Sequence, residues 1–283
     1  MEIIINNKYF CNFCKGEMSI KIKVSDIVLG RCHDCGSWSM LTGFINETEL
    51  YNKEYFEKHY IKYEKARKEY FKNLLGFFPS FVKKGDSIFD VGCGTGIFLK
   101  VLRERADVEI AGIDNSTDAV ELSRERLNLG ENKVMVGDLL NKQVQNKDLV
   151  TIIDVLAHIK NAGDYLRHII ESMLEPRGRL FIKTPYKPYL LFLITQFLSY
   201  IIGGKAKGLI HVPAQIHHFT PRSLKKILER EGMEIEKFTY IPEVKTRSDI
   251  TFKLIGYQAV RRIVAALSLF RTDASFCILA RKK

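Results

Sequence analysis

Three glycines at alternate positions within residues 87–97 constrain the fold of this chain more than any other feature. The run SIFDV before them favours a short buried strand, and the residues after them favour a helix. Because glycine has no β-carbon, Gly92, Gly94 and Gly96 let a ligand approach the backbone and permit positive φ angles. The unpaired N–H groups at the start of the following helix favour an anionic group. The segment therefore predicts a nucleotide-like ligand at a strand–turn–helix junction.

Four more apolar runs follow at the spacing of alternating strands and helices, at residues 108–114, 133–137, 148–154 and 178–183. The first ends in Asp114, about 20 residues beyond the glycine turn, where a ribose would be met. Asp138 follows the second run and Asp154 ends the third. Ser116 is expected to cap a helix that ends near Leu127. The pattern predicts an α/β, doubly wound sheet with ligands at its carboxyl edge.

The motifs FDVGCGTG, GIDNS, GDLL, DVLAHI and LEPRGRLFIKTP together resemble those of the class I S-adenosylmethionine (SAM)-dependent methyltransferases, over roughly residues 80–240. The resemblance implies a seven-stranded Rossmann-like sheet whose last strand is antiparallel. Residues 275–281 suit that role, beside residues 234–240. The rival ligand is NAD, but Ile97 occupies the place where a dinucleotide fingerprint has its third glycine.

The resemblance also implies which residues hold SAM. The turn would admit the methionine end, Asp114 would hold the ribose, Asp138 would meet the adenine edge, and Asp90 would orient the turn or reach the amino group. The full set of candidate SAM-binding residues is Asp90, Gly92, Cys93, Gly94, Gly96, Asp114, Asn115, Asp138, Leu139, Asp154, Tyr55 and Tyr60.

Cys11, Cys14, Cys32 and Cys35 form two C-x₂-C pairs separated by 17 residues, a spacing that predicts a structural zinc site. Two disulfides or a redox pair are the alternatives, and the first would need an oxidising compartment. Residues 1–45 are therefore expected to form a zinc ribbon. Its role would be either to brace the molecule and shape the acceptor pocket or to grip nucleic acid. Trp38 and Phe44 are the expected exposed aromatic residues, too few for a base-stacking platform.

Residues 46–84 predict a helical gate or linker rich in aromatic residues, ahead of a methyltransferase domain at residues 85–283. Tyr55 and Tyr60 have helical spacing, which is consistent with packing against the sheet domain. The segment also resembles the one that precedes the first motif in zinc-ribbon methyltransferases, where it lies over SAM. Both roles stay open for these two tyrosines.

His158 follows the fourth strand, at the edge where a transferable methyl group would emerge, and is the candidate general base. The alternative is a histidine that caps a helix or packs in the core. In the ubiquinone-pathway O-methyltransferases that this segment resembles, a glutamate precedes this histidine, whereas Ala157 stands here and puts a metal-dependent mechanism in doubt. His217 and His218 are expected on a loop before a helix that begins at Thr220.

Two apolar insertions are expected near residues 187–210 and 245–272. They could cover an apolar acceptor, dock at a membrane surface, cover each other or form a dimer interface. The chain of 283 residues carries a formal charge of +11, which suggests an acidic partner: nucleic acid, anionic lipid or a phosphorylated substrate. A basic surface with no specific target is an equal alternative. No signal peptide is evident, and no apolar run approaches about 20 residues, so a cytoplasmic location is expected, with the inner face of the membrane as a variant.

These features predict a SAM-dependent methyltransferase with a structural zinc ion. The expected reaction is O-methylation of a sugar, a polysaccharide precursor or a lipid-linked small molecule, with peripheral membrane contact. The alternatives are an RNA methyltransferase that uses the zinc ribbon and the basic surface, and a non-catalytic SAM-binding scaffold.

Overall fold

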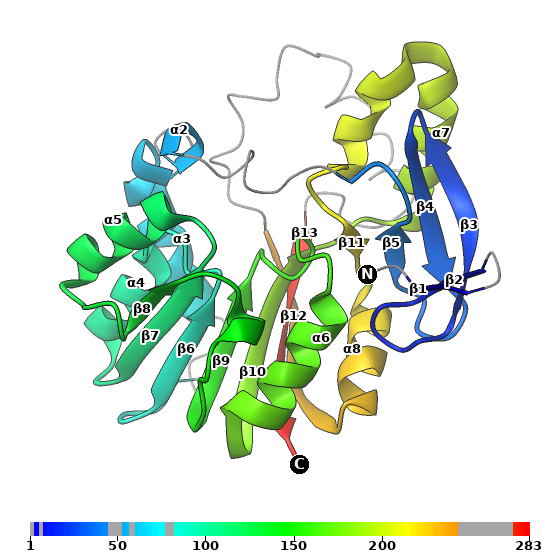
Figure 1. The fold of residues 1–283 in the computed structure, drawn as a ribbon. Helices are drawn as coiled ribbons and strands as arrows, with labels where there is room; N and C mark the ends of the chain where they lie inside the picture. The colour runs from blue at the N-terminus through cyan, green and yellow to red at the C-terminus, as the bar shows by residue number, and fades with distance from the viewer. Residues whose placement is uncertain (1–2, 6–7, 45–52, 57–59, 77–81, 243–273) are drawn as a thin grey trace.

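The computed structural model describes residues 3–5, 8–44, 53–56, 60–76, 82–242 and 274–283. At its centre is a seven-stranded sheet in the order β12-β13-β10-β9-β6-β7-β8 (Figure 1). Its strands are β6 (Ser87–Val91), β7 (Glu109–Asp114), β8 (Val134–Val136), β9 (Lys147–Ile153), β10 (Leu174–Pro185), β12 (Met233–Pro242) and β13 (Ala274–Lys282). Strand β13 runs antiparallel to both β10 and β12, and β6 to β10 pair in parallel, so the predicted fold class is confirmed.

Helices cover both faces of this sheet, because both faces of its strands are apolar. One face packs against α3 (Glu64–Gly76), α4 (Ile97–Arg105) and α5 (Thr117–Leu127). The other packs against α6 (Ala162–His168), which continues as a π-helical turn η3 (Ile169–Met173), and against α8 (Pro221–Arg230). Two short elements are α2 (Lys53–Phe56) and η2 (Leu139–Asn141).

Two predicted helix caps are confirmed. Ser116 Oγ accepts a hydrogen bond from the backbone N–H of Ala119 at 3.3 Å, and α5 ends at Leu127 as expected. Thr220 and Ser223 form a reciprocal capping box at the start of α8, with bonds of 3.1 and 2.8 Å. These caps fix where α5 and α8 begin relative to the carboxyl edge of the sheet.

A second sheet holds the cysteine pairs and has the order β1-β2-β3-β4-β5-β11. Its strands are β1 (Ile3–Ile5), β2 (Lys8–Phe10), β3 (Glu17–Val24), β4 (Ile27–Cys32), β5 (Trp38–Met40) and β11 (His217–His218). The expectation that His217 and His218 lie on a loop is wrong, because they pair antiparallel with Ser39 and Trp38 and are buried. The last strand of the N-terminal sheet is thus β11, which lies almost 180 positions after β5 in the sequence.

The first apolar insertion forms α7 (Tyr189–Ile202), which continues as the 3₁₀ helix η4 (Gly203–Ile210), and both pack on the second sheet (Figure 1). The Phe192 ring stacks on Trp38, with ring centroids 4.7 Å apart and planes 7° apart. Trp38 is therefore buried, at 4% exposure, which corrects the expectation of an exposed aromatic residue. Phe44 is half-buried under the Lys160 ammonium group, 4.7 Å from its ring centroid.

The outward face of α7 is also apolar. Leu191, Phe192 and Thr195 face the sheet, whereas Tyr189, Leu193, Phe197, Tyr200 and Ile201 form an exposed stripe at helical spacing, with Phe197 65% and Tyr200 79% exposed. Together α7 and η4 span 22 residues, long and apolar enough to cross a membrane by length and composition alone. Both elements lie within the predicted insertion near residues 187–210, whereas the expectation that no apolar run approaches about 20 residues is wrong, because η4 continues past the glycines at 203 and 204.

The second apolar insertion, at residues 245–272, lies outside the described residues. The side chain of Tyr55 also lies outside them.

Replacing Phe192 with alanine should lower the free energy of unfolding by about 3–5 kcal/mol, because it removes a fully buried ring and its stacking on Trp38. The matched control is Phe197→Ala, on the opposite side of the same helix, which should change stability by less than about 0.5 kcal/mol. Denaturant unfolding of both variants measures the difference, and equal losses would contradict the assignment of the two faces.

Candidate functional site at the carboxyl edge of the sheet

The glycine turn lies directly against the segment that follows β9. All three glycines have positive φ, between +51° and +74°. A β-carbon on Gly92 would lie 2.3 Å from Val155 Cγ2, and one on Gly96 would lie 2.3 Å from Ser123 Oγ. A β-carbon on Gly94 would meet only the Tyr60 ring, at 3.7 Å. Glycine is thus required at Gly92 and Gly96 by packing, whereas Gly94 keeps the backbone accessible below Tyr60.

Asp114, at the end of β7, holds this turn in place. Its carboxylate accepts hydrogen bonds from the backbone N–H groups of Gly94 and Ser116, both at 2.9 Å. Burial raises the pKa of Asp114 above its ordinary value, although these backbone bonds oppose the rise. Asn115 next to it is exposed. A carboxylate at the end of the second strand, next to the turn, fits the recognition of ribose hydroxyls.

Asp90 is buried within β6 and faces the neighbouring strand. Its Oδ1 atom accepts a hydrogen bond from Thr151 Oγ1 at 2.6 Å. Burial raises the pKa of Asp90 to about 7, against the effect of the Thr151 bond and with a further contribution from Asp114. The group is therefore poised between its neutral and charged forms near neutral pH. Cys93, also buried, packs against Gly112, so only its backbone faces the turn's ligand side.

Asp138 and Leu139 follow β8 at the same edge. Asp138 Oδ1 caps η2 by accepting from the N–H of Leu140 at 2.9 Å, and it also accepts from the Tyr165 hydroxyl at 2.5 Å. Leu139 is buried. Tyr165, from α6, thus orients a predicted cofactor-binding carboxylate. No local pattern predicts this contact, because the two residues are 27 positions apart.

Asp154 is held by a lysine that sequence reasoning missed. It has a left-handed backbone, with φ of +58°, and forms an ion pair with Lys183 on β10. Lys183 is buried, and although burial opposes its charged form, the Asp154 carboxylate raises its pKa above the ordinary value. The Lys183 ammonium group also lies 5.4 Å from the centroid of the Tyr70 ring. A lysine directly after three apolar residues of a buried strand was the available signal.

Tyr60 lies over the glycine turn, between an aromatic and a cationic neighbour. Its ring centroid is 5.2 Å from that of Phe56 and 3.7 Å from the Arg67 guanidinium carbon. Arg126 links this region to the turn, because it donates to the Thr95 carbonyl and pairs with Glu64 at 2.8 Å. Tyr60 therefore lies over Gly94, and its contact with SAM stays a prediction.

His158 closes the turn after β9, and its ring is oriented by the chain that precedes β11. Its Nδ1 atom lies 2.7 Å from the Ala214 carbonyl oxygen, which can only accept, so Nδ1 carries the proton and the lone pair is on Nε2. The Ala157 carbonyl accepts from the N–H groups of Ile216 and His217 at 2.8 and 3.0 Å. The candidate base is thus fixed at the boundary between the two sheets.

His217 and His218 are less suited to proton transfer. Burial lowers the pKa of His217 to about 4 and, together with the charge of Lys187, lowers that of His218 to about 3. His217 Nδ1 lies 2.8 Å from the hydroxyl of Ser39, whereas His218 packs edge-on against the ring of Phe192 at 5.2 Å. Both imidazoles are neutral at physiological pH and act in packing.

The four cysteines meet the geometric test for a zinc ion. Their sulfur atoms all lie within 4.8 Å of one another, at 3.6 Å for Cys11 and Cys35 and 3.4 Å for Cys14 and Cys32. Zn–S bonds of about 2.3 Å in a tetrahedron place sulfurs about 3.8 Å apart. All four are free thiols, and a hydrogen bond with Cys11 is the main cause that lowers the pKa of Cys32 to about 6. The set fits a closed structural zinc site with no position for a substrate.

Comparison with known proteins identifies the family to which this chain belongs. A family model described as "Methyltransferase domain" matches residues 62–237. A probable cobalt-precorrin-6B C(15)-methyltransferase (decarboxylating) of Methanobrevibacter smithii is 32% identical over 37% of this chain and 57% of its own length. A ubiquinone biosynthesis O-methyltransferase of Coxiella burnetii is 25% identical over 56% of this chain and 68% of its own length.

Solved structures share the fold. The magnesium protoporphyrin IX methyltransferase of Synechocystis PCC 6803 with bound SAH aligns with a TM-score of 0.54, at 18% identity, over 84% of this chain and all of that one. A complex of the Haloferax volcanii Trm112 methyltransferase activator with a methyltransferase aligns with a TM-score of 0.56, at 16% identity, over 80% of this chain and 92% of that one.

The raised pKa of Asp90 predicts how stability depends on pH. The folded state keeps a proton that the unfolded chain loses between about pH 4 and pH 7, so the free energy of unfolding falls as pH rises through that window and is level above it. Asp90→Asn removes this titration and should gain stability relative to the parent by on the order of 3–4 kcal/mol between pH 4 and pH 8. Urea unfolding at both pH values measures the change, with Asp107→Asn at an 83% exposed side chain as the control. A constant difference between parent and Asp90→Asn would contradict the assignment.

Proposed function

Because this chain belongs to the methyltransferase domain family and is a SAM-dependent methyltransferase, we propose that it methylates an oxygen atom of a small, lipid-linked acceptor, with His158 as general base. The relatives carry names that refer to ubiquinone biosynthesis and to porphyrin-type rings, which supports a small-molecule acceptor. The observation that carries the proposal is the hydrogen bond between His158 Nδ1 and the Ala214 carbonyl, because it leaves the basic lone pair on Nε2.

Residues of the carboxyl edge would divide the work between binding and proton transfer. Bound SAM supplies an activated methyl group on its sulfonium. Asp114, which bonds the Gly94 N–H, would hold the ribose, and Asp138, bonded by Tyr165, would meet the adenine edge. His158 Nε2 would accept the acceptor's hydroxyl proton, which makes the acceptor oxygen the nucleophile for the methyl group.

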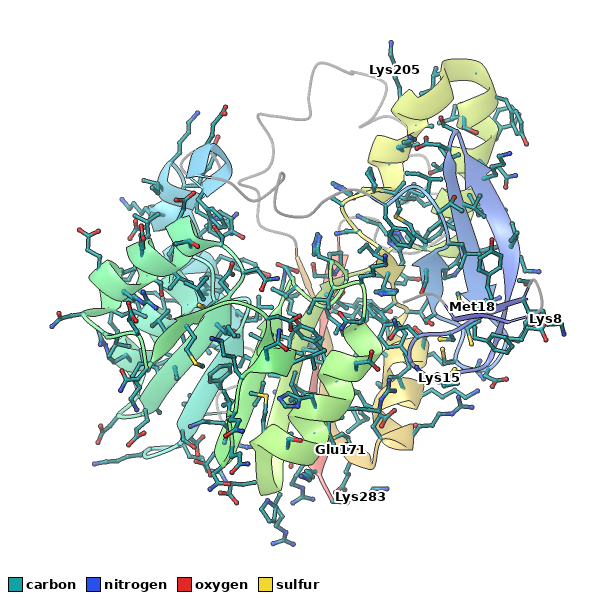
Figure 2. The ribbon with its side chains drawn as sticks, viewed as in Figure 1. Lys8, Lys15, Met18, Glu171, Lys205 and Lys283 are labelled. Carbon is teal, nitrogen blue, oxygen red and sulfur yellow. The ribbon has the colours of Figure 1, made fainter. Side chains whose placement is uncertain are left out.

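The exposed stripe of α7 supports a lipid-linked acceptor at an anionic membrane surface. The helix carries no charged residue, and its outward side chains are aromatic and aliphatic. Lys205 lies exposed at the outer tip of the helical segment (Figure 2), on a chain with a formal charge of +11. Because the opposite side of α7 packs on the second sheet through Phe192, the helix would lie along the bilayer surface with the stripe among the headgroups.

The RNA alternative loses part of its support in the described part of the chain. A single-strand platform needs exposed aromatic rings among basic residues, but Trp38 is buried and Phe44 is half-buried. We propose that the enzyme is cytoplasmic and acts at the inner face of the membrane.

His158→Ala should lower methyl transfer from labelled SAM to the organic-extractable fraction of its own cell's extract by about 10²–10⁴-fold, because the acceptor loses its base. The affinity for SAM, measured by calorimetry, should stay within about twofold of the parent value. His33→Ala, at an exposed ring on the second cysteine pair, is the control. Unchanged turnover in His158→Ala would remove the proposed base, and label that appears only in ribonuclease-sensitive material would replace the lipid-linked acceptor with RNA.

The membrane surface is tested by flotation with phosphatidylglycerol vesicles at low salt. The parent protein should float with them, binding should weaken as salt rises, and Phe197→Glu should abolish it by placing a charge within the stripe. Ile61→Glu makes the same change at another exposed apolar residue, near the start of α3, and should leave flotation intact. Failure of the parent to float, or equal losses in both variants, would contradict this surface.

A further inference from the structure

The first cysteine pair touches the loop that carries His158. Asn12, between Cys11 and Cys14, donates from Nδ2 to the Lys160 carbonyl at 3.1 Å and accepts at Oδ1 from the N–H of Gly163 at 3.0 Å. One side chain therefore bonds both the loop after His158 and the first turn of α6. These are contacts between residues about 150 positions apart in the sequence.

The fit at this contact is close enough to require glycine on the other side. A β-carbon at Gly163 would lie 2.4 Å from the Asn12 carbonyl oxygen and 2.6 Å from its Oδ1. Any larger residue at position 163 would push the cysteine turn away from the loop. Arg167 adds a third bond to the same turn, from Nη1 to the Phe13 carbonyl at 3.3 Å. Three hydrogen bonds and close packing at Gly163 thus join the cysteine turn to this segment.

The neighbouring residue Phe13 holds the other side of the His158 loop. Its ring packs edge-on against His217 at 5.0 Å and against Phe219 at 5.2 Å. His217 in turn shares the Ala157 carbonyl with Ile216, next to His158. The loop is therefore clamped between Asn12 on one side and the β11 segment on the other, and both clamps start at the same cysteine turn.

We propose that Asn12 is a positioning residue, which transmits the order of the four-cysteine site to the loop at residues 157–163 and so fixes the His158 ring. A metal ion held by Cys11 and Cys14 would fix the backbone on both sides of Asn12, and the two hydrogen bonds of Asn12 would carry that order across to the loop. The chemical consequence for methyl transfer rests on the proposed role of His158, whereas the mechanical link does not. Groups that react must be placed to a fraction of an ångström. A residue that holds the loop of a reacting group can therefore change the rate without touching the substrate.

The test compares Asn12→Ala with the parent by hydrogen exchange, by nitrogen-15 NMR of the histidine rings and by zinc analysis. In Asn12→Ala, exchange of the amides at residues 157–163 should rise by up to about tenfold, since loss of a hydrogen bond worth about 1 kcal/mol corresponds to a factor of that order. The His158 Nδ1–H signal should broaden or disappear. The zinc content and the affinity for SAM should match those of the parent. Methyl transfer should fall by about 10-fold to 100-fold.

Two further variants separate the bonds of Asn12 from its place in the turn. Asn12→Asp keeps an acceptor for Gly163 but loses the donor to Lys160, and should give an intermediate rise in exchange. Lys8→Met alters an exposed side chain on the neighbouring strand β2 (Figure 2) and should leave loop exchange, the His158 signal and transfer unchanged. In the parent, removing zinc with a chelator should raise exchange at residues 157–163 while exchange in β7 stays as before.

Unchanged loop exchange in zinc-loaded Asn12→Ala would overturn the proposal. Loss of zinc from that variant together with loop order, while Asn12→Asp keeps both, would assign the effect to the metal site and overturn the role of the side chain. If His158→Ala retains full transfer while Asn12→Ala still loosens the loop, the proposed base fails and the mechanical link stands.

Discussion

The parallel pairing of β9 with both β6 and β10 is the constraint on which the rest of this structure depends. It places Gly92, Asp154 and Tyr186 after the ends of three adjacent strands, at one edge. The approach of Gly92 to Val155 leaves no room for a β-carbon, so the cofactor turn and the loop that carries His158 touch directly. A shift of β9 by one residue would reverse which side chains face each layer and would separate the two loops.

Two segments that are far apart in the sequence join the second sheet to this edge. Strand β11 comes from the segment after β10, yet it pairs with β5, and α7 with η4 packs on the same sheet rather than on the methyltransferase sheet. The cysteine turn then reaches back to the loop at residues 157–163. The N-terminal sheet is therefore tied to the carboxyl edge of the central sheet, because its cysteine turn bonds the segment after β9 and its last strand, β11, comes from the segment after β10.

The elements that could be predicted from the sequence are those with a local signal. The order of the strands, the caps at Ser116 and Thr220 and the four-cysteine cluster follow from periodicity, capping chemistry and spacing, and all are present. The two-residue strand β11 is too short to have a period, so the sequence indicated a loop. Trp38 was expected at the surface because the helix that covers it lies about 150 positions away. Contacts such as that of Tyr165 with Asp138, or of Lys183 with Asp154, depend on the tertiary fold alone.

Charge at the carboxyl edge is opposite in sign to charge on the whole chain. The chain carries a formal +11, yet Asp90, Asp114, Asp138 and Asp154 gather at this edge, and the charge of the buried Lys183 is offset by its pair with Asp154. Burial raises the pKa of both Asp90 and Asp114, and the charge of Asp114 raises the pKa of Asp90 further. A ligand with a sulfonium and an ammonium group relieves that cost by favouring the carboxylates. The pyrophosphate of a dinucleotide would add to it, because its charge has the same sign as theirs. The electrostatics of the edge therefore favour SAM over a dinucleotide. This argument is independent of Ile97, which stands where a dinucleotide fingerprint has its third glycine.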